Sequence, residues 1–313
     1  MTTRTTRLAT ALLGGAAALL TLAAPATAAP AGTTGGIRVT AQRLVLEPTD
    51  QGYEGTLTAT VTNRKPTATS VNLVITEPAG ASFATIEPGG ACLYERLVEN
   101  RLVISCLGDR IEAGRSATFR LGFHVWTTVR DHALIADGGR IEVVPDGAAR
   151  AADATGFTTL FRSTTGSLRN PRPYVQATET DLSIRGGAVT LNRQPDGSLL
   201  GRMPVTVRYG NDAPTFALYV EAALPSEVQV HHIEPQDEPS FPNWFTVPGG
   251  RFLPGEERTF DVILSAPAGT PAGELGTGTF TVAGSYFWQA ADPQDVDPAD
   301  NSTSFAVTAV DAS

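Results

Sequence analysis

The chain has 313 residues, of which 42% are hydrophobic, 18% charged and 7% aromatic. This length suits about two domains of roughly 100–200 residues each, and the composition excludes a disordered chain, a collagen and a coiled coil. The 23 basic residues are outnumbered by 32 acidic ones, and no block of Lys or Arg stands out. Because nucleic-acid binding needs clustered basic side chains to displace the counterions of phosphates, we expect no nucleic-acid partner.

The segment 1–28 has the three parts of a secretory signal peptide. Arg4 and Arg7 precede an apolar stretch, Leu8 to Ala24, and small residues that a signal peptidase accepts end at Ala28. We therefore expect cleavage after Ala28. The alternative is an uncleaved membrane anchor, which the shortness of the stretch and its weakly hydrophobic Ala and Gly residues disfavour.

The mature chain is expected to begin with a short tail over residues 29–35. No later segment approaches the 18 or more apolar residues of a membrane-spanning helix, so we expect no transmembrane anchor after cleavage. The sequence thus predicts a secreted, extracellular protein, at most loosely associated with the cell envelope. Its preference for Arg over Lys, with Lys65 as the single lysine, resembles the coding bias of high-GC actinobacteria.

Alternation of apolar and polar residues dominates the rest of the chain. It is clearest over residues 56–62, 119–126 and 260–265. A period of two with one apolar face indicates β-strands packed on a core, and Gly- and Pro-containing turns separate these runs at short intervals. Many short strands without an amphipathic helix predict an all-β fold of antiparallel sandwiches.

The strand pattern also occurs twice. The segment Gly55 to Asn63 resembles Gly201 to Asn211, and the second copy follows the first by roughly 145 residues. We therefore expect two tandem immunoglobulin-like sandwiches, one over 36–162 and one over 178–311. The linker between them, 163–177, contains turn-forming residues and then two prolines, which makes it semi-rigid.

Both halves resemble known bacterial surface domains. The run Gly89-Gly-Ala-Cys92, Val103-Ile-Ser-Cys106-Leu-Gly108 and Ile111-Glu-Ala-Gly114-Arg-Ser-Ala-Thr118-Phe119 resembles the bacterial surface "conserved repeat" domain, number eleven in the series of domains of unknown function. The second half, through Leu253-Pro-Gly255 and Asp297-Pro-Ala-Asp-Asn301, is similar to the cell-adhesion-related bacterial immunoglobulin-like domain. The resemblance implies immunoglobulin-like sandwiches and names no activity.

Cys92 and Cys106 are the two cysteines of the chain, and both lie in the exported part. Export favours a disulfide. A hairpin with a three-residue loop, Val98 to Asn100, would place the two cysteines directly opposite each other. The alternative, a redox pair, lacks the Cys-x-x-Cys spacing, so we expect a structural bridge.

A group of acidic residues lies in a Pro-containing loop before the last expected strand. Carboxylate oxygens are ligands of Ca²⁺, which makes these residues a candidate calcium site. The alternative is a solvated turn in which Asp and Asn cap the backbone. The spacing does not fit an EF-hand loop, so we favour the turn and expect no cofactor unless calcium binds here. The residues concerned are Asp292, Asp295, Asp297 and Asp300.

Aromatic residues of the second half are candidates for ligand binding. Trp244 lies in a Pro-rich segment, 235–248, and Tyr286 and Trp288 share one face of an expected strand. If exposed, such rings could stack on sugars or anchor a partner. If buried, they belong to the core, which the average burial of Trp and Tyr favours.

Catalytic signatures are absent from the sequence. It has no Gly-x-Ser-x-Gly elbow and no His-Glu-x-x-His helix, and the adjacent His231 and His232 would point to opposite faces of a strand. We therefore expect a non-enzymatic interaction or spacer protein of the cell envelope, with a protein or an envelope polymer as its partner. The alternative is a glycan- or wall-binding module that uses the aromatic residues of the second half. A third hypothesis is an extracellular hydrolase whose catalytic residues come from distant loops.

Overall fold

The computed structural model describes residues 36–286 and 293–311. The predicted signal peptide and tail, together with Trp288 and Asp292, lie outside these ranges. Every regular element of the described residues is a β-strand, so the predicted all-β class is confirmed. No helix in these ranges is long and apolar enough to cross a membrane.

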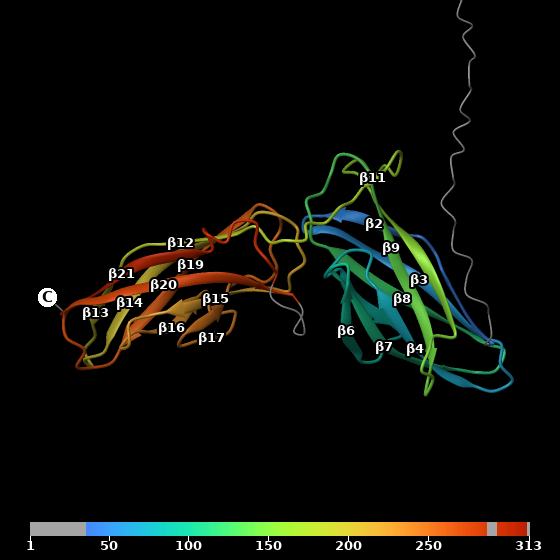
Figure 1. Ribbon diagram of the computed structural model, residues 1–313, viewed down its shortest axis with the longest axis horizontal. Helices are drawn as coiled ribbons and strands as arrows, with labels where there is room; N and C mark the ends of the chain where they lie inside the picture. Colours follow the sequence, from blue (N-terminus) through green and yellow to red (C-terminus); the bar gives the residue numbers. More distant parts are fainter. Residues whose placement is uncertain (1–35, 287–292, 312–313) are drawn as a thin grey trace, which may run out of the picture. The chain divides into compact units, whose positions relative to one another are not determined.

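The first sandwich contains strands β1 to β11 (Figure 1, blue to green). Its strand order is β5-β8-β3-β2-β10-β9-β4-β7-β6, with β1 beside β3 and β11 beside β9. The strands are β1 (Ile37–Ala41), β2 (Leu44–Thr49), β3 (Gly52–Asn63), β4 (Thr69–Thr76), β5 (Phe83–Glu87), β6 (Cys92–Val98), β7 (Arg101–Ile111), β8 (Ser116–Val125), β9 (Leu134–Pro145), β10 (Asp153–Phe161) and β11 (Arg172–Pro173).

The second sandwich contains strands β12 to β21 (Figure 1, yellow to red). Its strand order is β16-β19-β14-β13-β21-β20-β15-β18-β17, with β12 beside β14. The strands are β12 (Leu182–Gly186), β13 (Val189–Arg193), β14 (Leu199–Tyr209), β15 (Ala217–Ala223), β16 (Gln229–Glu234), β17 (Ser240–Phe241), β18 (Trp244–Thr246), β19 (Glu256–Ala266), β20 (Gly273–Ser285) and β21 (Ser302–Val310).

The two strand orders are copies of each other. Each strand of the first order corresponds to the strand eleven numbers later in the second, and β1 beside β3 corresponds to β12 beside β14. Even the parallel pairs match, because β2 pairs with β10 and β13 with β21. Each copy has its own buried apolar cluster between its layers. The chain is thus two tandem immunoglobulin-like sandwiches.

The linker expected over residues 163–177 is partly attached to the first sandwich. Arg172 and Pro173 form β11, which pairs in parallel with β9. The ring of Tyr174 then packs on Phe161, with 4.9 Å between the ring centroids. The second half of this segment is therefore held by β9 and Phe161 of the first sandwich, in addition to being stiffened by its prolines.

A disulfide joins Cys92 and Cys106, and the predicted pairing is confirmed. The predicted three-residue loop is wrong. Val98 pairs with Arg101, so the turn has two residues, Glu99 and Asn100, both with positive φ as a type I′ hairpin requires. A bulge in β6 between Tyr94 and Arg96 then shifts the register by one residue and brings the cysteines opposite each other.

A buried carboxylate closes the loop that follows β4. Glu77 is 1% exposed, and its two oxygens accept hydrogen bonds from the backbone amides of Ala81 (3.0 Å), Phe83 (2.7 Å) and Leu102 (2.9 Å). Three backbone donors that would otherwise be buried without partners are satisfied in this way. The bonds fix the loop to the start of both β5 and β7.

The same loop receives residues from the second sandwich. Residues 32–313 form one compact unit, and within it Tyr286, which is 6% exposed, packs against the apolar cluster of the first sandwich. Its hydroxyl oxygen accepts from the amide of Ala81 (3.1 Å) and its proton is donated to the carbonyl of Asn100 (3.0 Å). Arg251 donates to the carbonyl of Ala81 (2.8 Å). The Glu77 loop is thus a contact point between the two copies.

Asp212 fixes the end of the linker. Its carboxylate accepts from the hydroxyls of Thr127 (2.7 Å) and Tyr174 (2.9 Å) and from the amide of Ala177 (3.1 Å). Gln176 adds hydrogen bonds to the backbone of both Asp212 and Gly80. One carboxylate thereby ties the first sandwich, the linker and the second sandwich together.

Glu77 should make the stability of the protein depend on pH. Burial raises its pKa from 4.5 to about 7. Between these values the folded protein binds a proton that the unfolded chain has released, so the free energy of unfolding falls as pH rises from about 4.5 to about 7 and then levels off. The loss expected from this group is on the order of 3 kcal/mol. Thermal melts of residues 29–313 across this pH range measure it.

The matched variants are Glu77→Gln, which removes the titrating group, and Glu274→Gln, which removes one charge from an exposed position. We expect the fall in the free energy of unfolding between pH 4.5 and about 7 to disappear in Glu77→Gln and to remain in Glu274→Gln. An unchanged decline in Glu77→Gln would show that another group causes it.

Asp212→Ala should release the linker. Two hydroxyls and one amide lose their acceptor, so we expect proteolysis within residues 163–178 to become at least about tenfold faster, because local opening becomes less costly. Asp196→Ala is the control, since Asp196 bonds only Ser198 in an exposed turn. Equal cleavage rates in wild type and Asp212→Ala would contradict a linker held by this carboxylate.

Candidate ligand-binding site on the second sandwich

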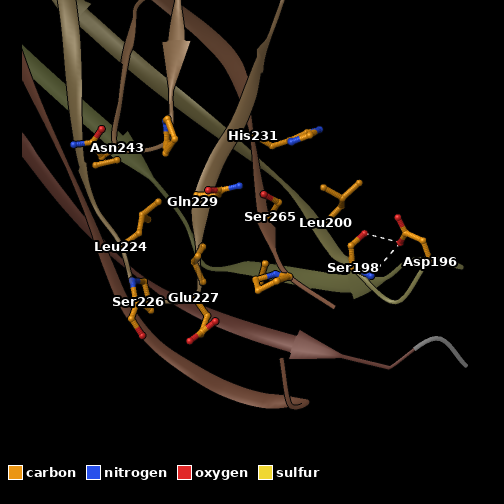
Figure 2. Close-up of a pocket in the computed structure, with 16 residues that line it drawn as sticks. Asp196, Ser198, Leu200, Leu224, Ser226, Glu227, Gln229, His231, Asn243 and Ser265 are labelled. Carbon is orange, nitrogen blue, oxygen red and sulfur yellow. Dashed lines mark hydrogen bonds between the residues drawn. The ribbon is translucent and has the colours of Figure 1, made fainter. Parts of the chain in front are cut away.

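The second sandwich has two grooves that share the residues Ala222 and Asn243. The first groove, of about 760 Å³, runs past the start of the edge strand β16, where polar side chains such as Gln229 and Ser265 stand beside Leu200 and Leu224 (Figure 2). It contains the serine, histidine and aspartate that a hydrolase would need.

These residues are not arranged as a catalytic triad. Asp196 accepts hydrogen bonds from the hydroxyl (2.7 Å) and the amide (3.0 Å) of Ser198, and Figure 2 shows His231 apart from this pair. The ring contact of His231 is with His232, at 5.0 Å between centroids. Among the described residues, His231 makes no hydrogen bond to a carboxylate or a serine. The groove therefore lacks an activated nucleophile of the Ser-His-Asp kind.

The second groove, which we call the aromatic groove, has a volume of about 680 Å³. It lies on the outer face of β20, β15 and β18. The inward residues of β15 are Leu218, Val220 and Ala222, which are buried in the core, so alternation along the strand turns Tyr219 and Glu221 outward. The groove is lined by Ala217, Tyr219, Glu221, Ala222, Ala223, Asn243, Trp244, Thr246, Thr281 and Ser285.

Five residues form a continuous row across this face. Strand pairing places Phe241 opposite Trp244, Trp244 opposite Glu221, Glu221 opposite Thr281, and Thr281 opposite Ser302. The row changes from aromatic rings through a carboxylate to a pair of hydroxyls, and the hydroxyls of Thr281 and Ser302 are 2.8 Å apart. The aromatic groove thus has an apolar end and a polar end.

Trp244 is supported from one side. Its ring is stacked on Phe241, with 4.4 Å between centroids and 17° between planes. Phe241 is 46% exposed and does not line the groove, whereas Trp244 does. The stack holds the indole in place while part of its surface faces the groove.

The candidate aromatic residues have different locations. Trp244 lies in the aromatic groove, and Trp288 lies outside the described residues. Tyr286 follows the buried alternative that the sequence favoured, because its ring is buried and its hydroxyl bonds the backbone of the first sandwich. It follows the end of β20 and contributes to packing, so it is not a ligand-binding ring.

Three lining residues, Tyr219, Glu221 and Asn243, were missed in the sequence. The signal for two of them was present, because in the segment 218–222 Leu218, Val220 and Ala222 alternate with Tyr219 and Glu221. Reading that period would have placed Tyr219 and Glu221 on the face opposite the core. Asn243 belongs to the turn between β17 and β18, whose position no local pattern indicates.

The acidic loop uses its carboxylates for the backbone. Asp295 accepts hydrogen bonds from the hydroxyl of Thr180 (2.9 Å) and from the amides of Leu182 (2.9 Å) and Asp297 (3.0 Å). Asp297 accepts from the amide of Ala299 (3.2 Å). These are the bonds of a capped turn.

The described carboxylates of the loop influence one another without forming a metal site. Desolvation raises the pKa of Asp300, and the like charges of Asp297 and Asp295 raise it further. In residues 36–286 and 293–311, no group of three or more His, Cys, Asp or Glu residues has the arrangement of a metal site. Asp292 lies outside these ranges.

Calcium should have little effect on stability. If the acidic loop bound Ca²⁺, the ion at 100 times its Kd would stabilise the protein by about 2.7 kcal/mol. We expect instead that the melting midpoint of residues 29–313 in millimolar calcium and in chelator will agree within about 1 °C. A rise of several degrees that Asp297→Ala abolishes would establish a calcium site.

No family model matches the chain, and no curated protein matches it. Similar solved structures include a protein of unknown function from Porphyromonas gingivalis W83, at 11% identity over 88% of this chain and 99% of that chain, with a TM-score of 0.24. The E. coli chaperone DraB matches at 12% identity over 88% and 97%, with a TM-score of 0.26. The Salmonella enterica SafA pilin in complex with the SafB chaperone matches at 12% identity over 84% and 96%, with a TM-score of 0.25. Because these scores are below 0.5, the fold class rests on the strand order.

Proposed function

We propose that this chain is a secreted, non-catalytic binding protein of the bacterial cell envelope or extracellular space. Its two sandwiches act as a spacer, and the aromatic groove of the second sandwich is its ligand site. The observation that carries the proposal is the supported Trp244 ring beside the Glu221 carboxylate in an open groove of about 680 Å³. Ligand sites combine aromatic surface with a few polar groups in this way.

The lining of the aromatic groove does not support hydrolysis. The aromatic groove is lined by one charged residue, Glu221, and the described lining contains no histidine or cysteine. A single carboxylate is not the pair of acids that glycoside hydrolysis uses, and no histidine of the described lining stands by to activate the serine and threonine hydroxyls. The groove is therefore suited to binding. The resemblance of both halves to bacterial surface domains agrees with this proposal.

Of the two partner classes expected from the sequence, an envelope polymer is favoured over a protein. Protein-binding hot spots are well-packed rings surrounded by a rim that excludes water. In this site Trp244 stands among small and hydroxyl-bearing residues, with Thr246, Thr281 and Ser285 lining the groove. Such a lining offers little apolar surface to a protein side chain and many hydrogen-bonding groups to a sugar. It therefore supports the glycan- or wall-binding alternative.

Binding to envelope material should depend on Trp244. We expect residues 29–313 to sediment with purified cell-wall polymers, and Trp244→Ala to reduce the bound fraction at least about tenfold. Leu93→Ala is the control, because Leu93 is 71% exposed and does not line the groove. A wild-type chain that binds neither wall polymers nor secreted proteins would refute the proposed function.

A further inference from the structure

The aromatic groove contains enough chemical detail to define its ligand class, and this inference rests on the proposed function. Three features restrict the ligand: the supported ring, the single carboxylate and the lack of basic side chains among the described lining residues. Each excludes a different class of polymer.

The ring selects a ligand with a flat face of C–H groups. The face of an indole carries partial negative charge, and it attracts weakly positive hydrogens. Trp244 is held by Phe241, so a ligand that stacks on it pays little to order the ring. A pyranose ring, whose axial hydrogens form such a face, fits this position.

The carboxylate selects a ligand that donates hydrogen bonds. Glu221 is paired across the sheet with Trp244 on one side and Thr281 on the other, and as a carboxylate it only accepts. A proline-rich peptide could stack on Trp244, but proline has no N–H to donate to Glu221. Adjacent sugar hydroxyls provide two donors, and hydrogen bonds to a carboxylate are about twice as strong as neutral ones.

The charge of the site excludes polyanions. None of the described lining residues is Lys, Arg or His, and Glu221 would repel a phosphate or a carboxylate. The chain as a whole is also acidic, with a formal net charge of −9. Polymers that carry phosphate or uronic acid would be repelled by both the groove and the overall field.

We propose that the aromatic groove binds an uncharged polysaccharide. The polysaccharide crosses the strands along the row from Trp244 to Ser302. One sugar lies on the indole, and the next lies over Glu221 and the hydroxyls of Thr281 and Ser302. Adjacent strands are about 4.8 Å apart, so Trp244 and Thr281 are separated by roughly 10 Å. That span takes more than one sugar ring, and an oligosaccharide should bind more tightly than a monosaccharide.

The test is calorimetric titration of residues 29–313 with neutral hexasaccharides of glucose and of N-acetylglucosamine, in several linkages. The comparison ligands are hyaluronate, polyphosphate and a polyproline peptide. We expect at least one neutral hexasaccharide to bind and the comparison ligands to bind at least tenfold more weakly. Glucose or N-acetylglucosamine alone should also bind at least tenfold more weakly than the corresponding hexasaccharide.

Two variants locate the site. Trp244→Ala should weaken the binding of the neutral hexasaccharide at least tenfold. Glu221→Gln, at an exposed position that does not threaten folding, should weaken it about three- to tenfold. The control Glu274→Gln removes a charge elsewhere on the same sandwich and should leave affinity unchanged. Unchanged melting midpoints show that each variant is folded.

The outcomes separate this inference from the proposed function. Tighter binding of hyaluronate, polyphosphate or polyproline than of every neutral hexasaccharide would overturn the inference and leave a binding protein. If a neutral hexasaccharide binds and neither Trp244→Ala nor Glu221→Gln weakens that binding, the inference is also overturned, because the site would lie elsewhere. Failure to bind any of these ligands, wall polymers or secreted proteins would overturn both.

Discussion

The buried carboxylate of Glu77 is the constraint on which the contact between the two sandwiches depends. It holds the loop after β4 by three backbone amides, at a position where an apolar residue would leave those amides without partners. The loop then offers the amide and the carbonyl of Ala81 to Tyr286 and Arg251 of the second sandwich. Without the carboxylate, the surface that receives these two side chains would have no fixed shape.

The duplicated strand order shows where the two copies have diverged. The hairpin β6–β7 of the first copy corresponds to β17–β18 of the second. In the first copy this hairpin is long and is closed by the bond between Cys92 and Cys106. In the second it is short, and its outer face carries Phe241 and Trp244. One position of the fold thus provides a covalent brace in one copy and a stacked aromatic pair in the other.

Much of the fold follows from local patterns in the sequence. Alternation identified the strands, and the repeat of the Gly55–Asn63 pattern at 201–211 identified the duplication, because both depend on neighbouring residues. The hairpin turn was misread because the bulge between Tyr94 and Arg96 changes the register without a local signal. Tyr286 is buried, as the sequence favoured, but its contact with the first sandwich could not be predicted. Its burial is produced by the Glu77 loop, more than 200 positions away in the chain, and no periodicity along β20 could show that contact.

The parallel pairing of an early strand with a late strand in each copy has a mechanical consequence. In each copy an early strand, β2 or β13, lies beside a late strand, β10 or β21, and runs in the same direction. When two parallel neighbours are pulled from opposite ends of a domain, their hydrogen bonds are loaded together along the strand direction and must fail as a group. An antiparallel pair pulled at one end would open one bond at a time. The proposed role at the cell envelope would place the chain under this kind of tension, and its lifetime under load would then be set by the rate of forced unfolding. Both sandwiches have this parallel pair, which is expected to slow their forced unfolding.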